Sequence, residues 1–113
     1  MEFRILGPLE VRDGGRVLDI PAGRARSLLA LLVLRAGEPI PAERLIDELW
    51  GERPPATAST ALQGFVSRLR KVLEPGRDPG EEATLLQTVG TGYRLAAAAD
   101  QVDANVFARM VTE

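Results

Sequence analysis

The stretch STALQGFVSRLRKVLE, residues 59–74, decides the fold because it predicts a helix with one apolar side and one polar, basic side. Apolar residues recur here at the helical spacing i, i+3, i+4 and i+7. They are Ala58, Ala61, Leu62, Phe65, Val66, Leu69, Val72 and Leu73. The pattern therefore predicts that residues 57–74 form an amphipathic helix whose apolar side packs on a core.

The other side of this predicted helix concentrates positive charge on a chain that is acidic as a whole. The chain has a formal net charge of -2, yet no acidic residue lies from Arg53 through Leu73. The polar side carries Thr60, Gln63, Gly64, Ser67, Arg70 and Lys71, with Arg68 at its flank. This local charge predicts an anionic partner for the helix.

Duplex DNA is the anionic partner that these residue types suit best. In the major groove, about 12 Å wide, Gln can pair with adenine and Arg with guanine, so Gln63 and Arg70 are the predicted base readers. Lys71 and Arg68 suit phosphates, which supply affinity and register. Gly64 lowers helix propensity by roughly 1 kcal/mol relative to Ala, and a close approach of the backbone to DNA would explain that cost. The helix alone leaves open the alternative of a solvated basic surface.

Length and composition limit the classes of function. A chain of 113 residues fits one domain, or one domain with a short extension. It contains no cysteine and no histidine, which excludes disulfides and removes the commonest general base and metal ligand. We therefore expect neither enzyme activity nor a cofactor. The longest apolar run, residues 28–34, is far shorter than the ~20 residues of a membrane span, and no signal peptide is recognisable, so we expect a cytoplasmic protein.

The remaining segments predict an α+β fold with an N-terminal antiparallel sheet, three helices and a C-terminal β-hairpin. Residues 3–12 and 16–20 are β-prone and flank a DGG turn. A GTG turn at residues 90–92 lies between two apolar segments, which is a hairpin signal. The predicted helices span residues 21–37, 42–50 and 57–74, and the predicted hairpin strands span 84–89 and 93–96. This order is typical of a winged helix-turn-helix.

Several motifs resemble the N-terminal domain of the Streptomyces antibiotic regulatory proteins, an OmpR/PhoB-type winged helix. They are FRILGPLEV near the N-terminus, ELWG at 48–51, VSRLRKVL at 66–73 and GYRL at 92–95. The resemblance covers residues 1–97. The segment VDANVFARM, within residues 98–113, resembles the beginning of a bacterial transcriptional activator domain. The expected organisation is therefore a DNA-binding domain at 1–97 followed by a linker and the start of a second domain.

The resemblance implies a sequence-specific transcriptional activator, of the kind that controls secondary metabolism. It implies that helix 57–74 enters the major groove and that the hairpin, or wing, at 84–96 meets the minor groove. It also implies head-to-tail binding to direct repeats and contact of loop 51–58 with RNA polymerase. Carried residue by residue, the recognition surface falls on Thr60, Gln63, Ser67, Arg68, Arg70 and Lys71.

Other single residues carry weaker expectations. Val89 stands where related wings often have a basic or bulky residue, so a minor-groove contact has to come from Thr91, Arg94 or backbone amides. Arg53 suits either a phosphate or the polymerase-facing loop. Trp50 and Tyr93 are predicted core residues. Two further arginines, Arg24 and Arg26, are expected at the surface, and an acidic patch is formed by Glu43, Asp47, Glu48 and Glu52.

The alternative function is a winged helix that binds a partner protein and no DNA. The negative net charge leaves room for that function. Because protein–DNA binding weakens steeply with salt, a salt titration separates the two.

Overall fold

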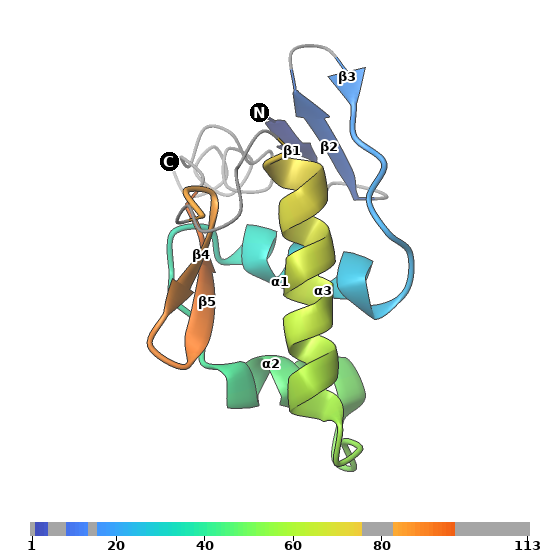
Figure 1. Cartoon of the computed structure of the whole chain (residues 1–113), viewed down its shortest axis with the longest axis vertical. Coiled ribbons are helices and arrows are strands. Elements are labelled where there is room, and N and C mark those ends of the chain that lie inside the picture. The colour runs from blue at the N-terminus through green and yellow to red at the C-terminus, as the bar shows by residue number, and fades with distance from the viewer. Residues whose placement is uncertain (1, 5–8, 14–15, 76–82, 97–113) are drawn as a thin grey trace, which may run out of the picture.

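Three helices lie between a small N-terminal sheet and a C-terminal hairpin (Figure 1). The computed structural model describes residues 2–4, 9–13, 16–75 and 83–96, so the predicted second segment, from residue 98 onward, lies outside the described residues. The elements are β1 (Glu2–Arg4), β2 (Glu10–Asp13), β3 (Arg16–Val17), α1 (Arg24–Leu34), α2 (Ala42–Trp50), α3 (Ala58–Leu73), β4 (Leu86–Val89) and β5 (Gly92–Leu95). The predicted α+β winged helix is thereby confirmed.

The N-terminal sheet is antiparallel, in the order β1-β2-β3. Phe3 of β1 faces Val11 of β2 in the register, and both side chains are fully buried. Because side chains alternate between the two faces of a strand, this pair belongs to the core-facing side of the sheet. The sheet therefore contributes directly to the same core as the helices.

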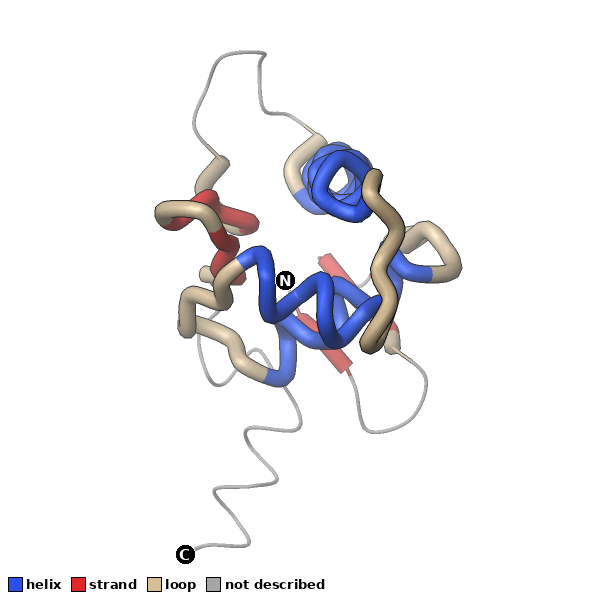
Figure 2. The backbone as a smooth tube through the Cα atoms, turned by 90° about the horizontal axis from the view of Figure 1, so that it is seen from below, coloured by secondary structure: helices blue, strands red, loops and turns tan. Residues whose placement is uncertain are grey.

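The core lies between the helices, with α1 at its centre. Leu28, Leu29 and Leu32 of α1 are fully buried, and α3 packs against α1 and α2. Figure 2, which looks along α3, shows that helix end-on to one side of α1 and α2. The predicted apolar stripe of α3 is confirmed at its centre by Ala58, Leu62, Val66, Leu69 and Leu73, which are all buried. Ala61, Phe65 and Val72 are only half-buried because they lie at one flank of the stripe.

Some predicted element ends differ from the structure. The 42–50 helix is confirmed, but α1 begins at Arg24 rather than residue 21, because Gly23 adopts a φ of 76 just before it. It ends at Leu34 rather than residue 37. Strand β4 begins at Leu86 rather than residue 84, because the N–H groups of Thr84 and Leu85 bond the side chain of Glu74, the C-cap residue of α3. Within the described residues, no helix is long and apolar enough to cross a membrane.

The hairpin turns through Gly90 and Thr91, as the GTG signal predicts. Gly90 has a φ of 58, and no non-glycine residue among those described has a positive φ, which fits a type II′ turn. On its outer edge, β5 pairs with the segment between α1 and α2: Ile40 N–H donates to the Tyr93 carbonyl at 2.8 Å, and Tyr93 N–H donates back at 3.0 Å. The wing is thus anchored to the helical core.

Gly92 permits this close approach. A Cβ atom built at residue 92 would lie 2.1 Å from the Ile40 carbonyl oxygen, well inside van der Waals contact. Any side chain would therefore push the wing away from the α1–α2 connection.

Candidate nucleic-acid interface

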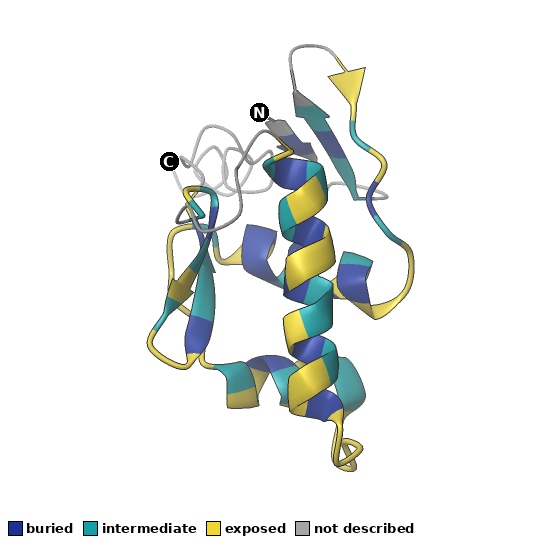
Figure 3. Ribbon diagram, in the orientation of Figure 1, coloured by how far each residue is buried: buried dark blue, intermediate teal, exposed yellow. Residues whose placement is uncertain are grey.

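The outward side of α3 brings together most of the predicted recognition residues. Figure 3 shows exposed positions recurring along this helix, on the side turned away from α1 and α2. The exposed members of the predicted set are Thr60, Gln63, Ser67, Arg68 and Lys71, and Gly64 between them is half-buried. A Cβ atom at Gly64 would meet nothing within 4 Å, so the fold itself does not require glycine there.

One flank of this surface is an aromatic stack that the sequence pattern does not predict. Trp50, at the end of α2, stacks on Phe65 of α3 with ring centroids 5.9 Å apart and an interplanar angle of 20°. The Arg24 guanidinium lies 5.2 Å from the Trp50 ring centroid, and that of Arg68 lies 5.6 Å from the Phe65 centroid. Both distances suit cation–π contacts. The result is a row of cation, ring, ring and cation across three helices.

The structure revises the expectations for Trp50 and Arg26. Trp50 does join α2 to α3, as predicted, but it is half-buried rather than part of the core, because its ring lies at the edge between the two helices. Arg24 is exposed, as expected, yet its Nε also donates to the Leu49 carbonyl at 3.3 Å. Arg26 differs more: it is half-buried and donates to the Leu9 carbonyl at 2.7 Å, which joins α1 to the N-terminal sheet region.

The other flank of α3 faces the wing, and Arg70 lies there. Its Nε donates to the Leu86 carbonyl at 2.9 Å, and its Nη2 donates to the Thr88 hydroxyl at 2.8 Å. Arg70 is half-buried. The structure therefore separates this predicted base reader from the exposed set and places it between α3 and β4.

Glu74, one helical turn after Arg70, also contacts the start of the hairpin. Its Oε1 accepts hydrogen bonds from the Thr84 N–H at 2.7 Å, the Thr84 hydroxyl at 2.9 Å and the Leu85 N–H at 3.0 Å. Burial acts to raise the pKa of this carboxyl, but the hydrogen bonds outweigh burial and the pKa lies below its ordinary value. The sequence pattern assigns Glu74 no role, because its partners Thr84 and Leu85 lie 10 and 11 residues further along the chain.

The tip of the wing is exposed, whereas the wing residue Arg94 bonds within the hairpin. Gly90 and Thr91 at the tip are exposed. Arg94 is half-buried, and its guanidinium donates to the Gln87 side-chain oxygen, the Nε contact being 2.9 Å, across the Gln87–Arg94 pair of the ladder. Tyr93 is half-buried against the core, close to its predicted place.

Residues 51–57, before α3, are all exposed, Arg53 among them. Ala58, the last residue of the predicted polymerase-facing loop, is instead the buried first residue of α3. Within the described residues, no group of three His, Cys, Asp or Glu side chains could hold a metal ion.

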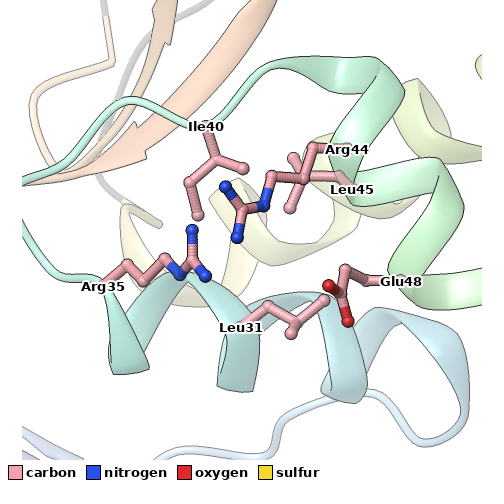
Figure 4. Close-up of a pocket in the computed structure, with 6 residues that line it drawn as sticks. All are labelled: Leu31, Arg35, Ile40, Arg44, Leu45 and Glu48. Atoms are coloured by element: carbon pink, nitrogen blue, oxygen red, sulfur yellow. The ribbon is translucent and has the colours of Figure 1, made fainter.

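A small pocket between α1 and α2 lies on the side away from α3 (Figure 4). Arg35 and Arg44 lie at its rim with Glu48, and its apolar lining comes from Leu31, Ile40 and Leu45. The mixture of both charges at the rim selects no particular ligand. We therefore assign this pocket no function.

Comparison with known proteins decides the family. Residues 21–95 match the family model described as "Transcriptional regulatory protein, C terminal". The chain belongs to this family. The matched range runs from the residues before α1 through β5, so it contains the whole surface described above.

Characterised relatives include three regulators from Streptomyces. The chain is 37% identical over 113 residues to the transcriptional regulator RedD of Streptomyces coelicolor, covering 100% of this chain and 32% of the relative. It is 34% identical over 116 residues to the regulatory protein DnrI of Streptomyces peucetius, covering 43% of that relative. It is 46% identical over 76 residues to the regulatory protein AfsR of Streptomyces coelicolor, covering 67% of this chain and 8% of AfsR.

A solved structure supports the same conclusion. Mycobacterium tuberculosis EmbR, in complex with a low affinity phosphopeptide, matches with a TM-score of 0.85 and 33% identity, covering 96% of this chain and 28% of that chain. The resemblance to the Streptomyces antibiotic regulatory proteins is confirmed, and so is the DNA-binding transcriptional regulatory class. The chain spans less than half the length of each of these relatives. The activity of a whole relative therefore does not transfer directly to this chain.

Proposed function

We propose that this regulatory domain binds promoter DNA sequence-specifically, with α3 in the major groove and the β4–β5 hairpin at the adjacent minor groove. The observation that carries the proposal is the outward side of α3. It combines exposed amide, hydroxyl and ammonium groups on Gln63, Ser67 and Lys71, and no acidic residue lies among them. These are the groups that read base edges and bind phosphates in a major groove.

The proposed contacts divide by chemistry. Gln63, Thr60 and Ser67 face base edges, because amides and hydroxyls can distinguish them. Lys71 binds phosphate, which adds affinity without sequence preference. Gly64 marks the closest approach of the helix backbone to the DNA, since open space surrounds the position where its Cβ would be.

Arg68 and Arg24 are the proposed phosphate contacts beside the groove. The two guanidinium groups lie at opposite ends of the Trp50–Phe65 stack, and both side chains are exposed. Holding two cations by ring contacts lowers the entropy that each would lose on binding a phosphate. The proposed backbone contact therefore extends from α3 to the beginning of α1.

At the wing tip, Thr91 and the neighbouring backbone amides are the proposed minor-groove contacts, because they are exposed. Arg94 can contact the minor groove only if its guanidinium gives up its hydrogen bond to Gln87. Arg53 adds a phosphate contact ahead of α3, close to the helix N-terminus, where backbone N–H groups also favour phosphate.

Two further partners follow from the family resemblance. The loop at residues 51–58 is the proposed contact for RNA polymerase, supported by the exposure of residues 51–57 and their position next to α3. Direct repeats in the promoter would seat two or more copies head to tail. Since its proposed target is promoter DNA, we place the protein in the cytoplasm.

Selection of bound sequences from a pool of random duplexes tests the proposal. We expect enrichment of a short motif, and the repeat spacing would report how copies are arranged. The variant Gln63→Ala should lose preference at one base pair, at a cost of about 1–3 kcal/mol. Recovery of no motif, together with capture of a protein partner through α3, would favour the protein-interaction alternative.

A further inference from the structure

Both edges of the wing are bonded to the rest of the domain, and the bonds at the two edges differ in kind. On the β5 side, the backbone of Ile40 pairs with that of Tyr93. On the β4 side, among the described residues, Arg70 of α3 donates to the Leu86 carbonyl, and Glu74, the residue after α3, accepts from the N–H groups of residues 84 and 85, which precede β4. An edge strand normally leaves such groups unpaired, and on β4 Arg70 of α3 satisfies one of them, the Leu86 carbonyl.

The Arg70 guanidinium makes two bonds in two directions along β4. Nε reaches the backbone at Leu86, and Nη2 reaches the side chain of Thr88, two residues further along the strand. A planar guanidinium fixes the angle between its donors. Two bonds to one strand therefore fix the strand's rotation relative to α3 as well as its distance.

We propose that Arg70 is a positioning residue: it sets the placement of the wing against the recognition helix instead of reading a base. This inference rests on the proposed DNA binding by α3 and the wing. Base reading through the Nε–Nη2 edge would require Arg70 to give up both bonds and leave the Leu86 carbonyl without this donor. The residues that read bases are then the exposed polar residues of α3, chiefly Gln63.

A base-reading residue and a wing-positioning residue differ in their effects on DNA binding and on the free protein. A base reader affects one base pair of the operator. A residue that positions the wing affects all operators by the same factor, because it changes how well helix and wing engage their two grooves together. It also changes the wing in the free protein, where a base reader has no effect.

The test uses Arg70→Ala, Thr88→Val and their combination, with Arg35→Ala as a matched control, because Arg35 is exposed and lines the pocket away from α3. Amide hydrogen exchange is measured on the free proteins. We expect faster exchange in β4 and β5 for both single variants, little further increase in the double variant, and no change for the control. Thr88→Val leaves α3 untouched, so it tests the contact even if Arg70→Ala folds poorly.

Affinity is then measured on a panel of duplexes that each differ from the selected motif at one base pair. We expect Arg70→Ala to weaken binding about tenfold on every duplex, with the ranking of duplexes unchanged. Loss of preference at a single base pair, with wild-type exchange in the wing, would overturn the inference. If the wild-type domain binds no duplex, the proposed function fails, while the exchange experiment still decides whether Arg70 positions the wing.

Discussion

Trp50 and Phe65 stack with ring centroids 5.9 Å apart, and through this contact the end of α2 meets the middle of α3. Both rings are half-buried and both carry an arginine on the outer side. The contact therefore serves stability and the proposed phosphate surface together. A substitution that removes one ring can separate these two contributions.

Phe65→Leu keeps an apolar side chain but removes the ring contacts. We expect a loss of about 1 kcal/mol in the free energy of unfolding, within the range for aromatic pairs beyond their burial. DNA affinity should fall further than this loss explains, because Arg68 loses its support. Urea unfolding and DNA titration of the same variant measure the two effects. If the variant binds DNA as tightly as wild type under conditions in which it is fully folded, the stack contributes to stability alone.

A glycine-to-alanine substitution can be compared at Gly92, which is tightly packed, and at Gly64, which faces open space. Gly92→Ala would place Cβ 2.1 Å from the Ile40 carbonyl oxygen, so we expect a loss of about 1–3 kcal/mol in unfolding free energy. Gly64→Ala meets open space inside a helix and should gain up to about 1 kcal/mol. Thermal unfolding of both variants is the measurement. Equal effects of the two substitutions would contradict the close packing of the wing on the α1–α2 connection.

Gly64 also tests the proposed close approach to DNA. Gly64→Leu should keep the fold, because a Cβ atom at residue 64 meets no atom within 4 Å, and it should lose DNA binding. Circular dichroism verifies the fold, and anisotropy of a labelled duplex reports binding. Wild-type affinity in Gly64→Leu would show that the helix backbone does not approach the DNA closely at this point.

Glu74 predicts a specific pH dependence. Its pKa in the folded protein lies below the ordinary value of 4.5, so the ionised carboxylate stabilises the fold above that pH. The contribution is lost as pH falls through the lowered folded-state pKa. Glu74→Gln should therefore be less stable than wild type near neutral pH, by about 1 kcal/mol for the weakened hydrogen bonds. The difference should shrink in acid, and a difference that stays constant down to pH 3 would contradict this role.

The sequence pattern predicts the helices well because it reports local spacing. Leu62, Val66 and Leu69 recur at helical intervals, and that regularity alone defines the buried and outward sides of α3. The exposed recognition set follows from the same wheel. Packing against α1 then buries the apolar stripe without changing its position.

The flanks of α3 could not be predicted in the same way, because their partners are distant in sequence. Arg70 bonds residues 16 and 18 positions later. One of its acceptors, the Leu86 carbonyl, is a backbone group, and a pattern of side-chain types cannot indicate a backbone acceptor. Arg24 meets Trp50 only because α1 begins where α2 ends in space. A basic residue on a helix therefore indicates charge at that surface, while its partner depends on the tertiary fold.

The central claim is that the outward side of α3 binds duplex DNA, and the salt dependence of binding tests it most directly. Affinity for the selected duplex is measured over a series of salt concentrations for wild type, Lys71→Ala and the control Arg44→Ala, whose side chain lines the pocket away from α3. We predict a steep slope for wild type and Arg44→Ala, and a slope shallower by about one for Lys71→Ala. A Lys71→Ala slope equal to that of wild type, or an equal change in the control, would contradict the claim.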